Sequence, residues 1–408
     1  MNQPAVEFNV SRPIPPFEPN TADLVLRFTM PLPVNPAPRQ PLNLALVLDR
    51  SGSMAGPALK LAKRAAQHAV RQLGPEDRVS IVAFDSTVEV VVPSTAVTQA
   101  ETIVQAIEHL RSGNSTALYA GWVAGMQEVQ SQRHHYSLNR VLLLTDGLAN
   151  VGPRNPDALA SQVAQALGTS VSTSVIGLGN HYNEVLLETL ALSGDGNYTY
   201  VEEPSQLEAV FTAELTGLQS MVGQQVSLGV EPEAGLSVME VWNDFPRTST
   251  GRLKLPHLRA GQPIEVALRV RTAGIQGQGR TLRLRLAWTD VVSGQRLRYR
   301  SAVTLPPLAA VPFLPAVASL VTSLQLARLK EQAVRATERG DMLGAAQSWQ
   351  QAEGTIRSGL SSGLSLQDDD LALQQVRDRL AHGDQASASK LARAQNYTRR
   401  QSKGQTKS

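Results

Sequence analysis

The sequence predicts an α/β doubly wound, Rossmann-like domain followed by an antiparallel β-sandwich and a helical C-terminal segment. Three patterns support this order. Residues 39–219 alternate buried apolar strands with helical runs, which is typical of a mostly parallel sheet with helices on both faces. Residues 223–307 contain short runs of alternating polar and apolar side chains, separated by turn residues. Residues 313–394 place apolar side chains at helical spacing.

The doubly wound domain is expected to span residues 39–220. Its first strand is a continuous apolar run, as expected for a strand that is buried on both faces. The strands are expected at Leu42–Leu48, Arg78–Phe84, Val88–Val92, Arg140–Thr145, Val171–Leu178 and, at the edge, Tyr198–Glu202. The helices are expected at Pro57–Leu73, Thr98–Leu110, Thr116–Gln132, Pro156–Leu167, Asn183–Leu192 and Pro204–Gln219.

The rest of the chain divides into four expected parts. Residues 1–38 are rich in proline and expected to be extended, except for an alternating strand at residues 22–30. We expect this strand to pair with the β-sandwich of residues 221–308, which would make the α/β domain an insertion into a β-domain. Residues 309–396 are expected to form helices, either as tetratricopeptide-like hairpins or as a cap on the sandwich. Residues 397–408 are expected to form a basic, disordered tail.

Composition narrows the chemistry that the chain can perform. The 408 residues include no cysteine, which excludes disulfides, thiolate metal sites and cysteine nucleophiles. Residues 1–12 lack the pattern of a secretory signal, and no apolar run approaches the roughly 20 residues that span a membrane. We therefore expect a cytoplasmic protein without a membrane span.

A polar loop follows the first predicted strand. It contains Asp49, Ser51 and Ser53, and Pro57 begins the next helical run. Ligands bind at the carboxyl ends of strands in open α/β sheets, and oxygen side chains suit a hard divalent cation. The loop therefore predicts a metal site. The alternative is that these residues serve only as turn and helix-capping residues.

Two later segments end at the same expected edge of the sheet. Thr116 begins a helical run, and the strand Arg140–Thr145 is followed by Asp146 and Gly147. Asp-x-Ser-x-Ser, followed by this Thr and then by Thr-Asp-Gly, resembles the von Willebrand factor A domain with an intact metal-ion-dependent adhesion site. The chain as a whole also resembles stand-alone bacterial proteins in which this domain is followed by a β-domain and a helical segment.

The resemblance implies a Mg²⁺ site, with Mn²⁺ or Ca²⁺ as substitutes. Ser51 and Ser53 would be direct ligands, Thr116 would bind directly or through water, and Asp49 and Asp146 would act mainly through water. This leaves one open position, which in the family accepts an aspartate or glutamate carboxylate from a partner protein. The residues expected to border this position are Arg50, Met54, Ser115, Gly147 and His181, although packing beneath the loop is the preferred role of Met54.

The sequence contains none of the short motifs typical of an enzyme. We find no Gly-rich phosphate loop with Lys, no Gly-x-Ser-x-Gly and no His-Glu-x-x-His. We therefore expect a non-enzymatic, metal-dependent protein-binding module or scaffold. One alternative is a non-catalytic subunit of an ATPase or metal-chelatase complex that works with a partner ATPase. The other is a nucleic-acid-associated protein that binds through its basic tail.

Overall fold

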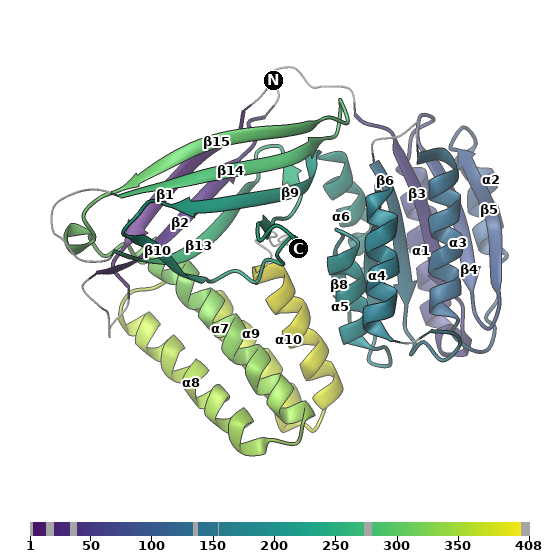
Figure 1. The fold of residues 1–408 in the computed structure, drawn as a ribbon. Coiled ribbons are helices and arrows are strands. Elements are labelled where there is room, and N and C mark those ends of the chain that lie inside the picture. The colour runs from purple at the N-terminus through teal and green to yellow at the C-terminus, as the bar shows by residue number, and fades with distance from the viewer. Residues whose placement is uncertain are drawn as a thin grey trace. The chain divides into compact units, whose positions relative to one another are not determined.

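The chain forms two compact units. The computed structural model describes residues 3–13, 20–32, 39–133, 138–153, 155–272 and 280–400. One unit comprises Ala37–Ser220, and the other combines Met1–Pro36 with Met221–Ser408. The first unit is therefore inserted between two segments of the second (Figure 1).

The α/β unit contains one six-stranded sheet in the order β5-β4-β3-β6-β7-β8. All neighbouring strands are parallel except β5, which is antiparallel to β4. The strands are β3 (Leu42–Asp49), β4 (Arg78–Phe84), β5 (Val88–Ala96), β6 (Leu138–Thr145), β7 (Val171–Leu178) and β8 (Tyr198–Val201). The predicted doubly wound fold is confirmed.

Helices flank this sheet (Figure 1). They are α1 (Pro57–Arg71), α2 (Ala100–Glu108), α3 (Leu118–Gln132), α4 (Pro156–Gly168), α5 (Glu184–Ser193) and α6 (Leu207–Gln219), with short 3-10 helices at Gly52–Met54 and Pro204–Gln206. Helix α3 contacts β3, β4 and β6. Glycine permits this close packing, because a Cβ atom on Gly125 would lie 2.3 Å from Cγ2 of Val47.

Helix α3 begins two residues later than the sequence predicts. We expected it to start at Thr116, but its first residue is Leu118. The backbone N–H of Thr116 donates to Oδ1 of Asn150 at 2.7 Å, and the Thr116 carbonyl accepts from the Asn150 N–H at 3.2 Å. Thr116 is therefore held by a distant loop, which sequence periodicity does not reveal.

The second unit contains two antiparallel sheets. One has the order β1-β2-β13-β10, and the other has the order β11-β9-β14-β15, with β12 also paired to β9. Strand β2, from the segment before the α/β unit, pairs with β13 from the segment after it. The strands are β1 (Ala5–Ser11), β2 (Thr21–Thr29), β9 (Met221–Pro232), β10 (Leu236–Val241), β11 (Leu253–Lys254), β12 (Leu258–Arg259), β13 (Pro263–Thr272), β14 (Arg280–Asp290) and β15 (Arg296–Leu305).

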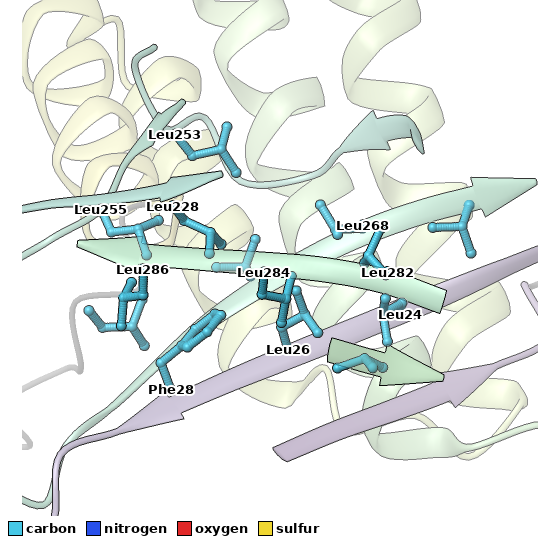
Figure 2. Packing of buried hydrophobic residues seen from close by; sticks show 14 of the residues in the cluster. Leu24, Leu26, Phe28, Leu228, Leu253, Leu255, Leu268, Leu282, Leu284 and Leu286 are labelled. Carbon is cyan, nitrogen blue, oxygen red and sulfur yellow. The ribbon is translucent and has the colours of Figure 1, made fainter. Parts of the chain in front are cut away.

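A hydrophobic core lies between these two sheets (Figure 2). Alternate side chains of β2, namely Leu24, Leu26 and Phe28, are fully buried in it. They pack with leucines of the second sheet, such as Leu284 and Leu286. Burial of each such side chain contributes about 1.5–3 kcal/mol. Strand β1 was not predicted, because most of its side chains are exposed and its proline-rich surroundings indicate an extended segment.

Four helices complete the second unit. They are α7 (Pro315–Glu338), α8 (Met342–Ser361), α9 (Gln367–Ala381) and α10 (Gln385–Arg400), preceded by a short 3-10 helix at Leu308–Ala310. Val317, Val321 and Leu324 of α7 pack against Val25 and Ala267, on the face of the first sheet opposite the core (Figure 1). Helix α7 thus covers this face of the sandwich. No helix in the described ranges is long and apolar enough to cross a membrane.

The end of the chain differs from the prediction. Residues 397–400 were expected to be disordered, but they continue helix α10, and Tyr397 is buried. A basic residue of this segment pairs with an acidic residue on another helix, since Arg399 of α10 lies 3.0 Å from Asp369 of α9. A basic composition was therefore misread as a free tail. Residues 401–408 of the expected tail lie outside the described residues.

Candidate metal centre

The predicted metal ligands meet where the strand order of the α/β unit reverses. Strand β3 leads to β4 on one side, and the chain later returns to place β6 on the other side of β3. Ligands bind in such sheets outside the carboxyl ends of the strands at this reversal. Asp49 is the last residue of β3, and Asp146 directly follows β6. Both carboxylates therefore belong to the expected binding edge.

Asp49 is fully buried, and it accepts two hydrogen bonds. The Ser51 N–H donates to Oδ1 at 2.8 Å, and the Thr145 hydroxyl donates to Oδ2 at 2.5 Å. No ion pair to Asp49 forms among the residues that the structure describes. Burial raises the pKa of Asp49 to about 6, although these hydrogen bonds favour its charged form. Burial also raises the pKa of Asp146, against a hydrogen bond from Ser53.

The hydroxyl groups form a connected cluster next to these carboxylates. The Oγ atoms of Ser51 and Ser53 are 3.1 Å apart, and Ser53 donates to Oδ1 of Asp146 at 2.7 Å. Thr116 reaches the same place, because a Cβ atom on Gly147 would lie 3.1 Å from Oγ1 of Thr116 and 3.6 Å from Oγ of Ser53. The structure therefore brings together the side chains of all the predicted ligands. Ser53 is exposed, so the cluster opens to solvent.

Hydrogen bonds between the loops fix this arrangement. The Gly52 N–H donates to the Asn114 carbonyl at 2.8 Å, and the Gly113 N–H donates to the Arg50 carbonyl at 2.7 Å. Gly113 must lack a side chain, since its Cβ atom would lie 1.8 Å from Oδ2 of Asp85. The first two loops are thus held as one body.

The donor set consists of oxygen atoms only. Among the residues that the structure places, no group of three or more histidine and acidic side chains could hold a metal ion. These loops instead offer two carboxylates and three hydroxyls, which are ligands for hard cations such as Mg²⁺.

Comparison with known proteins identifies this unit. Residues 43–213 match the family model of the von Willebrand factor type A domain, and this range contains all three loops. The α/β unit is a von Willebrand factor type A (VWA) domain.

Relatives of the VWA domain include two bacterial proteins described as uncharacterized. Protein sll0103 of Synechocystis sp. is 34% identical over 205 residues, which cover 50% of this chain and 48% of the relative. Protein YfbK of Escherichia coli is 30% identical over 191 residues, which cover 46% of this chain and 33% of the relative. The chain thus spans less than half the length of these curated relatives.

A solved structure extends the likeness beyond the VWA domain. The von Willebrand factor type A protein from Catenulispora acidiphila matches with a TM-score of 0.65 over 92% of this chain and 90% of its own, at 16% identity. At this identity the likeness indicates the fold alone, which includes the sandwich and the helices.

Only some of the residues predicted to form the rim of the VWA site are exposed. Met54 is fully buried, so its expected place on the rim is wrong and packing beneath the loop is its role. Arg50 is occupied by ion pairs with Asp85 at 3.2 Å and Glu89 at 2.5 Å. Gly147 is buried, Ser115 is half-buried and His181 is exposed, and the charge of His181 favours ionised Asp146.

Sequence reasoning missed three residues that shape the VWA site. Thr145 binds Asp49, Asn150 positions Thr116, and Asp85 binds Arg50. Asp85 could have been predicted from the sequence, because it directly follows the buried strand β4 at the same edge of the sheet. Although burial opposes it, hydrogen bonds from Thr87 and the charge of Arg50 hold the pKa of Asp85 below its usual value.

Proposed function

We propose that the VWA domain is a non-catalytic protein-binding module in which a Mg²⁺ ion links the three loops to an aspartate or glutamate carboxylate of a partner protein. The observation that carries this proposal is the environment of Asp49. Burial of a carboxylate without a cation costs several kcal/mol. Asp85, nearby, has the guanidinium of Arg50, whereas Asp49 has only hydrogen-bond donors. A divalent cation would supply the missing positive charge.

The spacing of the oxygen atoms suits this ion. Mg²⁺ binds six oxygens in octahedral geometry at about 2.0–2.1 Å, which places neighbouring ligands about 3 Å apart. The Ser51 and Ser53 hydroxyl oxygens are 3.1 Å apart. In our proposal these two bind the ion directly, and Thr116 binds directly or through water. Asp49 and Asp146 orient the hydroxyls and ion-bound waters, and Mn²⁺ or Ca²⁺ could replace Mg²⁺.

The open side of the cluster supports a partner carboxylate as the remaining ligand. An ion whose direct protein ligands are neutral hydroxyls keeps most of its attraction for an added anion. Exposed Ser53 and half-buried Asp146 support a position that is open at the surface. A carboxylate there would make a strong, directional contact at the centre of an interface. In this proposal the two serine hydroxyls act as ligands of the ion and not as nucleophiles.

The experiment has two steps on the full chain. Mn²⁺ binding is first measured by electron paramagnetic resonance for the wild type, Asp49→Ala, Ser53→Ala and the control Ser112→Ala, which alters an exposed serine of the neighbouring loop. We expect saturable binding in the wild type and the control, and a loss of roughly 10–100-fold in the two site variants. Equal binding by all four proteins, or binding by none, would contradict the metal site.

The second step tests the partner. Proteins are captured from native lysate by the wild type in Mg²⁺, by the wild type in EDTA and by Ser53→Ala in Mg²⁺, and are identified by mass spectrometry. A protein retained only in the first sample supports the bridge if replacing its contacting Asp or Glu with Asn or Gln releases it. Such a protein would also show whether the partner is an ATPase. Identical captures in all samples would contradict a metal-mediated contact.

A further inference from the structure

A pocket lies among the helices of the second unit. It has a volume of about 210 Å³ and is lined by side chains of α7, α8, α9 and α10. Lys330 and Asn396 are buried, whereas Asp368, Leu371 and Gln375 of α9 are exposed at the edge of the pocket. The pocket therefore has a polar interior and an opening beside α9.

Lys330 is a buried cation whose direct hydrogen-bond partner is a neutral amide, although the charge of Asp369 also acts on it. Its side chain is on α7, and the residue is only 7% exposed. Its ammonium group donates to the amide Oε1 of Gln395 at 2.7 Å, and no ion pair to it forms among the described residues. Burial lowers the pKa of Lys330 to about 8. A buried ammonium with only a neutral partner is costly, so an anion beside it would be favourable.

Asn396 gives a second, independent sign of a missing ligand. It is 3% exposed and lines the same pocket from α10. Neither its Oδ1 nor its Nδ2 atom has a hydrogen-bond partner among the described residues. An unsatisfied buried polar atom destabilises the fold, and Asn396 has two of them. A ligand that accepts from Nδ2 would recover part of this cost.

The other charged side chains of the interior already have partners. Arg399 donates to Oδ1 of Asp369 at 3.0 Å, and Asp369 also accepts a hydrogen bond from Ser323. The lining also contains the apolar side chains of Leu326, Ala327, Ile356, Ala372 and Leu373. Lys330 is therefore the cation of the described lining that forms no ion pair, although the charge of Asp369 acts on it.

We propose that this pocket binds a small aliphatic carboxylic acid, whose carboxylate pairs with Lys330 and accepts from the Asn396 amide while its carbon chain packs against Leu326 and Leu373. The volume sets the size of this ligand. It equals about seven water molecules at roughly 30 Å³ each, which is the size of a short organic acid rather than of a nucleotide. Water alone filling the pocket is the outcome that the experiment must exclude.

The experiment uses the full chain and three probes of similar shape. Butyrate carries the proposed anion, 1-butanol is its neutral analogue and butylammonium its cationic analogue. Binding is followed by thermal unfolding and by saturation-transfer NMR on the probe. We expect a saturable rise in unfolding temperature and a transfer signal with butyrate alone, with a dissociation constant in the millimolar range or tighter. No saturable response to butyrate would leave water as the occupant and overturn the proposal.

Two variants test whether butyrate binds specifically in this pocket. Lys330→Met keeps an unbranched side chain without the charge, and Asn396→Leu fills similar volume without polar atoms. We expect Lys330→Met to abolish the butyrate response and Asn396→Leu to weaken binding roughly tenfold. The control Arg377→Met removes an exposed cation of α9 outside the lining and should bind like the wild type. An equal butyrate response in Lys330→Met would overturn the proposal, and Asn396→Leu keeps the test valid if Lys330→Met does not fold.

Discussion

The three loops of the VWA domain that carry Asp49, Thr116 and Asp146 (the metal loops) and the helical pocket both bury charge. The two sites are built differently. In the loops, the polar groups bind one another at 2.5–3.1 Å and come from short segments with fixed spacing. In the pocket, Lys330, Asp369 and Asn396 come from different helices, and Asn396 has no partner in the described part of the chain. A site whose residues lie at fixed spacing in short segments can be predicted from a sequence. A site whose residues come from the faces of separate helices cannot.

The largest expected effect tests the rigidity of the metal loops. Gly113→Ala would place a Cβ atom 1.8 Å from the Asp85 carboxylate, so the two loops must separate. We expect the free energy of unfolding in urea to fall by roughly 1–3 kcal/mol and Mn²⁺ binding to be lost. Gly168→Ala is the control, because nothing lies within 4 Å of its Cβ position. Wild-type stability and Mn²⁺ affinity in Gly113→Ala would show that the loops are not tightly coupled.

The next effect concerns the unpaired charge of Asp49. Burial raises its pKa from 3.8 to about 6, so the folded state holds the proton more tightly than the unfolded state. Stability of the metal-free protein should therefore fall as pH rises from about 4 to about 6, by up to about 3 kcal/mol. Asp49→Asn should remove this loss and be more stable than the wild type in EDTA at neutral pH. It should also lose stabilisation by Mg²⁺.

Denaturant unfolding across this pH range, with and without EDTA, measures both properties of Asp49→Asn. A variant that is less stable than the wild type at every pH would show that the hydrogen bonds of Asp49 outweigh its buried charge.

Lys330 should show the opposite pH dependence. Burial lowers its pKa from 10.5 to about 8, so stability should rise as pH increases between these values. Lys330→Met should remove this rise and increase stability at neutral pH by about 1–3 kcal/mol. Chemical denaturation between about pH 7 and about pH 10 provides the measurement. A variant that remains as pH-dependent as the wild type would show that Lys330 is not the group responsible.

The smallest effect is expected at an exposed charge of the same helices. Arg377 of α9 forms an ion pair with Glu353 of α8, and its side chain is 53% exposed. Such pairs contribute at most about 1 kcal/mol, and Arg377→Met should change the free energy of unfolding by less than this. A larger loss would show that exposed ion pairs also contribute strongly to the stability of these helices. The difference in stability effect between Arg377→Met and Lys330→Met would then be smaller than expected.

Much of the fold could be predicted because its signals are local. Buried parallel strands such as β3 and β6 are continuous apolar runs, and the three loops carry fixed polar spacing. The missed features depend on distant partners. Asn150 delays the start of α3, and Asp369 binds Arg399 of the expected tail. Nothing within a few residues of Lys330 or Asn396 indicates that they meet in one pocket.

The pairing of β2 with β13 sets an order for folding during synthesis. Arg27 of β2 binds Glu265 of β13, which lies 238 positions later in the chain. At a translation rate of about 5–20 residues per second, the ribosome needs roughly 10–50 s to make the partner strand. During this interval Leu24, Leu26 and Phe28 have no sheet to join, while the contiguous VWA domain can already fold. The sandwich core can therefore be completed only after the segment that follows the VWA domain has been made.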